Sequence, residues 1–246
     1  MSIGSDVRHF EKVSSTNTVA ASMIREKRPE EGTVITASFQ EGGRGQAGNT
    51  WESETGKNLL MSVILYPIMV KPADQFIISQ FVSLAVCDVV RMHTRDVSIK
   101  WPNDIYVIND KIAGILIEHG IMGNTLASSV AGIGLNINQA VFTGDAVNPI
   151  SLCMLTGKSH DIDTIASDLI NSLDRRYRMV TAGDTLKLEK EYHSALFRRG
   201  EWHRFIDSGG EFEGMIDTVG SDGILTVNKR HGGSGKYAFK EIDYIL

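Results

Sequence analysis

A glycine-rich loop between two β-rich segments constrains the fold more than any other feature of the sequence. The loop, Gly43–Gly48, reads GRGQAG and follows the β-rich segment Gly32–Gln40, and the chain then enters a second such segment at Lys57–Tyr66. The glycine-rich turn of a dinucleotide-binding fold opens a helix, with an acidic residue about 20 positions further on. A strand–loop–strand order cannot aim a helix N-terminus at a pyrophosphate. The order therefore argues against a Rossmann fold, although the spacing fits GxGxxG.

The same loop could still bind an anion. Glycines let backbone N–H groups close on a phosphate or carboxylate, and Arg44 can add charge-assisted hydrogen bonds. Two other phosphate-binding loops do not fit. The catalytic signature of protein kinases is absent, and neither Gly56-Lys57 nor Gly157-Lys158 has the earlier glycine of a Walker A loop. Taken alone, a loop of this composition is more often a surface loop whose glycines only provide freedom.

The composition limits the class of protein. The 246 residues suffice for one large domain with a small one beside it, and 42% of them are apolar. The formal net charge of −5 lacks the basic excess of a general nucleic-acid binder. Cys87 and Cys153 form no CxxC pair, Met1–Phe10 contains no apolar signal-peptide core, and no apolar run approaches the roughly 18–20 residues of a membrane span. We expect a cytoplasmic protein that binds neither nucleic acid nor a membrane.

Hydrophobic periodicity predicts strands and helices mixed along the first three quarters of the chain. The strands are expected at Val7–Val13, Gly32–Gln40, Lys57–Tyr66, Ser98–Trp101, Asp104–Ile108, Lys111–Gly120 and Ser128–Ile137. The helices are expected at Thr18–Arg25, Pro72–Arg95, Asp163–Met179 and Thr185–Leu196, with Asp74 as the cap of the second.

The character of the sequence changes at about Phe197–Glu201. Short alternating segments separated by turn residues follow, which is typical of a small β-barrel. These segments are Glu201–Ile206, Gly210–Val219, Ile224–Lys229 and Lys236–Glu241. We therefore predict a domain boundary near residue 195, with a large unit over residues 1–195 and a small barrel over residues 196–246.

A polar cluster, Lys100-Trp101-Pro102-Asn103-Asp104, lies between two apolar strands. Asp104 could ligate Mg²⁺ and Asn103 could bind a phosphate or ribose oxygen, whereas an Asx-type turn with a packed tryptophan is the common alternative. Seven residues later, Lys111 opens an otherwise apolar strand, so it either extends its head group to solvent or meets an anionic ligand. A third strand ends with two glycines and an asparagine, Gly132-Ile133-Gly134-Leu135-Asn136.

The order and spacing of these motifs resemble the catalytic domain of biotin–protein ligases. The likeness runs from about residue 8 to 180, and the C-terminal barrel also looks like that of the family. Within it, KWPND followed by KIAGIL is specific to this family, whereas looser relatives share the glycine loop. The motifs that carry the resemblance are Ser15-Thr16-Asn17, Gln40, Gly43-Arg44-Gly45, Trp51, Lys100-Trp101-Pro102-Asn103-Asp104, Lys111-Ile112-Ala113-Gly114-Ile115-Leu116 and Gly132-Ile133-Gly134-Leu135-Asn136.

The resemblance implies an α+β fold: a mixed sheet with helices mainly on one face, as in class II synthetases and lipoate ligases, followed by a small SH3-like β-barrel. It also implies an activity. Residues 1–195 would be a catalytic domain that binds biotin and ATP, forms biotinyl-5′-AMP with the help of Mg²⁺, and transfers biotin to a lysine of a biotin carboxyl carrier protein or domain, a carboxylase subunit.

The resemblance also assigns roles to individual residues, which overlap at Arg44, Gln46 and Lys111. The catalytic residues would be Lys111, Arg44 and Asp104, with Asp104 also the candidate ligand of Mg²⁺ or the group that helps to deprotonate the acceptor amine. Biotin would contact Ser15, Thr16, Asn17, Gln40, Gly43, Arg44, Gly45, Gln46, Lys111 and Gly114. ATP would contact Gln46, Asn49, Trp51, Lys100, Asn103 and Asn136.

Two departures from the family pattern lead to further expectations. Related ligases commonly have a more basic loop, GRGRRGR-like, where this chain has Gln46, Ala47 and Asn49. We expect Gln46 to weaken the hold of the loop on biotinyl-5′-AMP. The catalytic pattern also starts almost at Met1, from which we expect a monofunctional ligase without an N-terminal DNA-binding domain.

Three questions stay open at this point. The same adenylation chemistry would suit a lipoate or octanoate ligase. A non-catalytic biotin-binding paralogue is a second alternative, which the presence of Arg44, Asp104 and Lys111 disfavours. The sequence also leaves both a monomer and a homodimer open.

Overall fold

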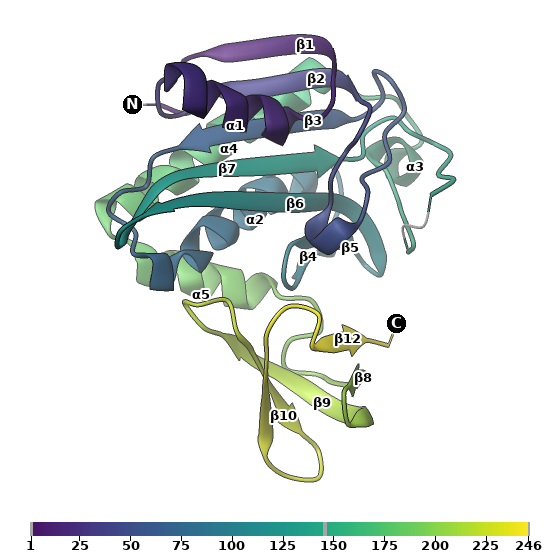
Figure 1. Cartoon of the computed structure of the whole chain (residues 1–246). Coiled ribbons are helices and arrows are strands. Elements are labelled where there is room, and N and C mark those ends of the chain that lie inside the picture. The colour runs from purple at the N-terminus through teal and green to yellow at the C-terminus, as the bar shows by residue number, and fades with distance from the viewer. Residues whose placement is uncertain (1, 145–146, 246) are drawn as a thin grey trace.

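A seven-stranded mixed sheet organises the larger part of the protein (Figure 1). The structure, a computed structural model, describes residues 2–144 and 147–245. The strand order is β1-β2-β3-β7-β6-β5-β4, in which β1 and β2 are parallel and every other neighbouring pair is antiparallel. The strands are β1 (Val7–Val13), β2 (Val34–Gln40), β3 (Leu59–Leu65), β4 (Val97–Lys100), β5 (Asp104–Val107), β6 (Asp110–Met122) and β7 (Thr125–Leu135).

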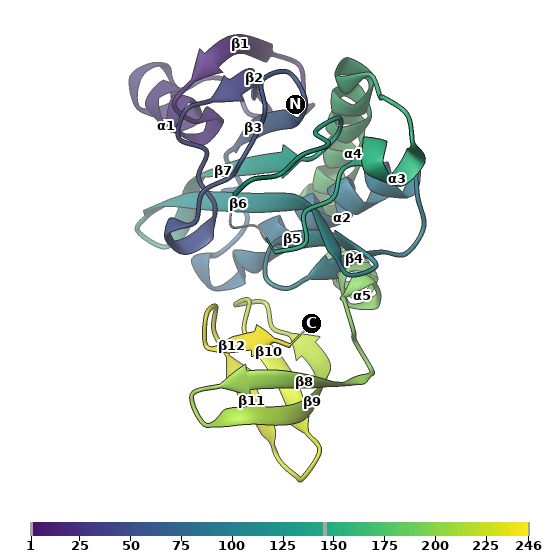
Figure 2. The same ribbon diagram turned by 90° about the vertical axis from the view of Figure 1, so that its right-hand side faces the viewer.

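The helices lie mainly on one face of this sheet, as Figure 2 shows, so the predicted fold class is confirmed. The helix α1 (Thr16–Lys27) covers the opposite face, over β2, β3 and β7. The remaining helices and 3₁₀ turns are η1 (Gln46–Gly48), η2 (Pro72–Asp74), α2 (Phe76–Arg91), α3 (Leu152–Thr156), α4 (Ile162–Ala182) and α5 (Thr185–Ala195).

Side-chain alternation along the central strands separates a packed face from a functional one. In β3, Met61 and Val63 belong to the main core, which includes the buried residues of α2 and α4. Between them, Ser62 points to the α1 face. Strand β7 repeats the pattern, with Ile133 in the core and the two flanking glycines, Gly132 and Gly134, on the α1 face. Because successive side chains of a strand point to opposite faces, the α1 face acquires a floor of small and polar residues.

The helix α2 forms the centre of the main core, and most of its residues are buried. The segment Pro72–Arg91 is long and apolar enough to span a membrane by length and composition alone, so the expectation that no apolar run approaches that length was wrong. However, 67% of its 18-residue apolar stretch is buried inside the protein, as in the core helix of a globular fold. The predicted single helix over Pro72–Arg95 is also interrupted, because Asp74 ends a 3₁₀ turn and Gln75 caps α2.

A second, antiparallel sheet follows the last helix, with the order β11-β10-β9-β8-β12. It packs against the first unit, since Trp101 donates a hydrogen bond from Nε1 to the carbonyl oxygen of Gly223 at 3.0 Å, and one buried core continues through both units. Its strands are β8 (Trp202–Asp207), β9 (Gly210–Val219), β10 (Leu225–Lys229), β11 (Ser234–Tyr237) and β12 (Ile242–Tyr244). The predicted strand at Lys236–Glu241 was therefore misplaced, because two very short strands flank a turn there.

Candidate active site

A cavity of about 800 Å³ lies on the α1 face of the large sheet. Its walls come from the start of α1, the glycine loop, the β4–β5 turn, β6, β7 and the end of the small sheet. Of the predicted site residues, only Gly43 does not line it. Gly43 instead accepts a backbone hydrogen bond from Trp51 at 2.9 Å and fixes the base of the loop. The predicted residues that line the cavity are Ser15, Thr16, Asn17, Gln40, Arg44, Gly45, Gln46, Asn49, Trp51, Lys100, Asn103, Asp104, Lys111, Gly114 and Asn136.

At one end of the cavity, the first turn of α1 is bonded to β2. Ser15 caps the helix with its backbone only, because its side chain makes no capping hydrogen bond and faces the cavity. Thr16 donates two hydrogen bonds to the Gln40 side-chain oxygen, from its backbone N–H at 2.8 Å and from its hydroxyl at 3.0 Å. The Gln40 oxygen is thereby occupied, so the amide of Gln40 offers its NH₂ group to other partners.

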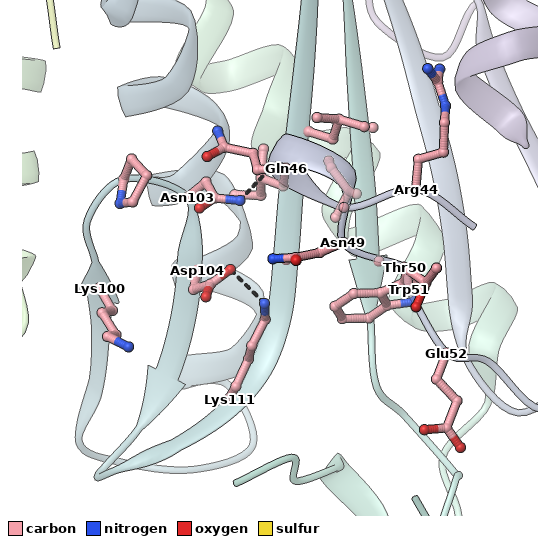
Figure 3. A pocket seen from close by; sticks show the side chains of 18 of the residues that line it. Arg44, Gln46, Asn49, Thr50, Trp51, Glu52, Lys100, Asn103, Asp104 and Lys111 are labelled. Atoms are coloured by element: carbon pink, nitrogen blue, oxygen red, sulfur yellow. Dashed lines mark hydrogen bonds and ion pairs between the residues drawn. The ribbon is translucent and has the colours of Figure 1, made fainter. Parts of the chain in front are cut away.

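Asn17 connects the same end of the cavity to β6. Its side-chain NH₂ group donates to Glu118 at 2.8 Å and to the carbonyl oxygen of Leu116 at 3.2 Å. Arg44 donates to the same Glu118 carboxylate at 2.8 Å. The structure therefore places Arg44 beside Glu118, and Figure 3 shows its side chain pointing away from Lys111 and Asp104.

At the other end of the cavity, Lys111 and Asp104 form an ion pair with Nζ and Oδ1 2.7 Å apart (Figure 3). The two side chains are only 25% and 20% exposed, so solvent screens this pair less than a surface pair. They come from neighbouring strands, since β5 pairs with β6 and Asp104 begins β5. The structure thus brings together two residues of the predicted catalytic set and leaves Arg44 apart from them.

Lys100 brings a second cation to this end. Its ammonium group lies 3.2 Å from the hydroxyl of Tyr106 and over the rings of Tyr106 and Tyr244, at 4.9 and 5.1 Å. Burial lowers the pKa of Lys100, and the nearby charge of Lys111 adds to that effect, whereas Asp104 opposes it. The aromatic faces partly replace the water that a buried ammonium group loses.

Glycines of the floor seat the indole of Trp51. A side chain at Gly134 would overlap the indole, and a Cβ at Gly114 would lie 2.8 Å from its Cζ3. The ammonium group of Lys111 lies 5.7 Å from the centre of the ring system. The glycines of the KIAGIL and GIGLN motifs therefore let an aromatic plane lie flat on the sheet next to the ion pair.

The two predicted nucleotide-binding asparagines anchor the cavity wall. Asn103 donates from its side chain to the carbonyl oxygen of Ile115 at 2.8 Å. Asn136 donates to the carbonyl oxygen of Ile150 at 3.0 Å, and its Oδ1 is buried with no partner among the residues that the structure describes. Asn136 lines the cavity, and this oxygen keeps an unused acceptor capacity next to it.

The glycine loop contains one 3₁₀ turn, η1, which is too short to act as a helix terminus. Gly45 donates its backbone N–H to Asn49 at 2.7 Å, and Asn49 donates to Gln46 at 3.1 Å. Within the described part of the chain, the side-chain oxygen of Gln46 is buried without a partner. The loop is therefore closed on itself, with Gln46 directed into the cavity wall.

Sequence reasoning missed Glu52, which ties the loop after Trp51 to a distant segment. Its carboxylate accepts hydrogen bonds from the backbone N–H groups of Thr143 at 3.0 Å and Gly144 at 2.7 Å, and from the side chain of Gln139 at 3.3 Å. The backbone bond from Thr143 is the main cause that lowers the pKa of Glu52. A pattern search could not find it, because the partners lie far away along the chain.

The residues present can contribute one ligand to a metal ion. No group of three or more His, Cys, Asp or Glu side chains with metal-binding geometry occurs in residues 2–144 or 147–245. Asp104 is a carboxylate inside the cavity, and Mg²⁺ in nucleotide sites is often held by one or two carboxylates together with phosphate oxygens. Asp104 therefore fits a role in holding Mg²⁺ that arrives with a nucleotide, and the protein alone forms no such site within the described ranges.

Known proteins resemble this chain over most of its length. The sequence profile of the biotin/lipoate A/B protein ligase family matches residues 9–136. The bifunctional ligase/repressor BirA of Bacillus spizizenii is 27% identical over 234 residues, which cover 94% of this chain and 71% of that protein. The biotin–[acetyl-CoA-carboxylase] ligase of Mycobacterium tuberculosis is 29% identical over 182 residues, or 70% of this chain and 65% of that one. The structure of biotin protein ligase from Aquifex aeolicus in complex with biotin and ATP superposes with a TM-score of 0.79 at 21% identity, covering 97% of this chain and 98% of the other, which shows a common fold.

Proposed function

Because the chain belongs to the biotin/lipoate A/B protein ligase family, we propose that it activates biotin with ATP as biotinyl-5′-AMP and transfers the biotinyl group to a lysine of a biotin carboxyl carrier protein or domain. Family membership makes the chain a ligase. The observation that carries the proposal is the pairing of two unlike ends in one cavity. A neutral hydrogen-bonding end at Thr16 and Gln40 suits a polar head group, and a charged end at Lys111 and Asp104 suits the reacting anions.

In the first step, a carboxylate oxygen of biotin attacks the α-phosphorus of ATP, and the bond to the bridging oxygen breaks as pyrophosphate leaves. Two anions must approach each other, so cations placed where the charge develops lower the barrier. Lys111 provides that charge, and the flat face of Trp51 beside it supports the adenine. Lys100, which lines the same cavity, adds a second positive charge for the phosphates. Mg²⁺, when bound, would further neutralise the phosphate oxygens, with Asp104 as its protein ligand.

In the second step, the amine of the carrier lysine attacks the acyl carbon of biotinyl-5′-AMP. A C–N bond forms, and AMP leaves with the acyl oxygen. A lysine amine with an ordinary pKa near 10.4 must first lose a proton to water, and its nitrogen loses a second proton to water as the amide forms. Asp104 lies in the cavity wall and orients the incoming amine. In this proposal residues 1–195 form the catalytic unit, and the barrel of residues 196–246 closes the cavity with residues such as Tyr244.

The deciding experiment is to mix the protein with biotin, MgATP and a biotin carrier domain and to measure intact masses. We expect one biotinyl group on one lysine of the carrier. A folded protein that leaves a competent carrier unchanged would contradict the proposal. Biotin-dependent ATP–pyrophosphate exchange tests the first step alone, and exchange that lipoate supports and biotin does not would assign the chain to the lipoate branch of the family.

A further inference from the structure

A buried serine lies directly behind the head-group end of the cavity. Ser62 is fully buried in the middle of β3, and it is not part of the cavity wall. Its hydroxyl lies 2.7 Å from the hydroxyl of Thr16 and 2.6 Å from the side-chain oxygen of Asn17. Ser62 therefore contacts both of the α1 side chains that face the cavity, although it comes from a strand on the other side of them.

The surrounding hydrogen bonds fix the two amide groups that take part. The Gln40 oxygen faces the backbone N–H of Thr16, and a reversed amide would place two donors against each other there. The Asn17 NH₂ group faces the carbonyl oxygen of Leu116 and the Glu118 carboxylate, so it cannot be reversed either. Both amide oxygens thus point into the cluster of hydroxyl groups.

The cluster of hydroxyl groups has fewer protons than oxygen–oxygen contacts. Three oxygen–oxygen contacts connect its members: Ser62 with Asn17 at 2.6 Å, Ser62 with Thr16 at 2.7 Å, and Thr16 with Gln40 at 3.0 Å. The only hydroxyl protons available for them are those of Ser62 and Thr16. The cluster is therefore rich in acceptors and short of donors, whereas the NH₂ group of Gln40 remains a donor. Such an end matches a head group that both donates N–H bonds and accepts one, as a cyclic urea does.

We infer that Ser62 is a positioning residue for this head-group end and sets its selectivity for a ureido group. The inference rests on the proposed function, because a ureido ring is the head group of biotin. The Ser62 hydroxyl holds the oxygens of Thr16 and Asn17 in the orientation in which their remaining lone pairs face the ligand. Without it, the buried side-chain oxygen of Asn17 loses its hydrogen-bond donor, and the Thr16 hydroxyl loses its contact on the β3 side. The dithiolane ring of lipoate has no N–H or C=O group and cannot form hydrogen bonds of this kind with Thr16, Asn17 or Gln40.

The test is steady-state ATP–pyrophosphate exchange with the whole chain carrying Ser62→Ala. A buried acceptor left without its donor changes binding by about 10-fold, so we expect the KM for biotin to rise by that factor. The KM for ATP and the kcat should stay within about twofold of the unaltered protein, because the charged end of the cavity is untouched. A general loss of structure would instead lower kcat or raise both KM values.

Ser83→Ala is the matched control. Ser83 is also a fully buried serine, it lies on α2 outside the cavity wall, and its hydroxyl has no partner among the described residues. Its loss should leave both KM values unchanged. An unchanged KM for biotin in Ser62→Ala, or an equal rise in the KM for ATP, would overturn the inference. If the unaltered protein shows no biotin-dependent exchange at all, the proposed function fails instead.

Discussion

The two ends of the cavity are built in opposite ways. The head-group end has a buried network of neutral groups, Thr16, Asn17 and Ser62, which are tied to one another by hydrogen bonds. The charges at that end, Arg44 and Glu118, are paired with each other and more exposed. The charged end consists of Lys111, which is paired to Asp104, and of Lys100, which lies nearby with a lowered pKa. A buried neutral network of this kind selects a ligand by matching its donors and acceptors. At the charged end, two ammonium groups share one carboxylate, and the excess positive charge favours the binding of an anionic ligand.

This difference predicts that the binding of biotin and the chemical step depend on separate residues. Changes at the neutral end should alter the KM for biotin, whereas changes at the charged end should alter kcat and the use of ATP.

The largest effect is expected for Lys111→Met, which removes the cation beside Asp104. Loss of one group that stabilises transition-state charge commonly costs about 1000-fold in rate, and we expect a loss of that size in biotin-dependent ATP–pyrophosphate exchange. Lys229→Met is the control, because Lys229 also forms an ion pair with an aspartate at 2.9 Å but lies in the small sheet. Equal losses in the two variants would contradict an active-site role for Lys111.

Lys100→Met should weaken activity and strengthen folding. We expect about a 100-fold loss of exchange activity, mainly through ATP. Burial holds the pKa of Lys100 below its ordinary 10.5, so the unfolded chain binds this proton more tightly than the folded one. The contribution of Lys100 to stability therefore rises as pH increases toward 10.5. Urea unfolding should find the variant more stable at pH 7, with the advantage shrinking up to pH 10. A variant less stable at pH 7 would contradict this reasoning.

The two floor glycines offer a paired test of the division. An alanine at Gly132 would overlap the side-chain oxygen of Asn17, and an alanine at Gly134 would overlap the indole of Trp51. Overpacking of this kind changes binding by about 30-fold, so Gly132→Ala should raise the KM for biotin and Gly134→Ala the KM for ATP. The division would fail if both variants raised the same KM.

Much of the fold followed from the sequence, because alternation with a period of two is a strong local signal. The strands β1 and β9 have the predicted bounds. For Lys111, the sequence left open whether its head group reaches solvent or meets an anionic ligand, and its pairing with Asp104 appears only in the structure. The short strands β11 and β12 did not follow, since three or four residues give too little pattern and their ends depend on pairing.

Other parts of the site depend on tertiary contacts that one sequence does not encode locally. Ser62 stands alone in the apolar strand LLMSVIL, and its importance appears only when α1 is packed over it. In the sequence Glu52 is an ordinary polar loop residue, and only the folded chain brings the backbone N–H groups of Thr143 and Gly144 to its carboxylate. Arg44 carries the expected charge, yet its orientation is set by Glu118 on a distant strand.

Gln46→Arg should shift the loop toward tighter retention of the intermediate. The Gln46 oxygen is buried without a partner in the part of the chain that the structure describes, and an arginine there would add charge-assisted bonds to a phosphate. We expect the release of biotinyl-5′-AMP to slow by about fivefold to 10-fold, measured by displacement with excess unlabelled ligand. An unchanged rate of release would show that this position does not set retention.

The smallest effect on activity is expected for Asp207→Asn, which breaks an ion pair of the small sheet that resembles the one in the cavity. Asp207 accepts hydrogen bonds from Lys229 at 2.9 Å and Tyr237 at 2.8 Å, which, with the backbone N–H of Gly209, lower its pKa from 3.8 to about 2. A lowered carboxyl pKa stabilises the fold fully above pH 4, and this contribution is lost as the pH falls through about 2.

We therefore expect Asp207→Asn to keep full exchange activity, to unfold more easily than the unaltered protein between pH 4 and 7, and to match it as the pH approaches 2. Acid unfolding followed by circular dichroism measures the difference. The Lys229–Asp207 and Lys111–Asp104 pairs have nearly the same length, 2.9 and 2.7 Å, so their chemistry alone does not distinguish them. If Asp207→Asn lost activity as Lys111→Met does, the charged end of the cavity would extend into the small sheet, and the division between binding and chemistry would have to include it.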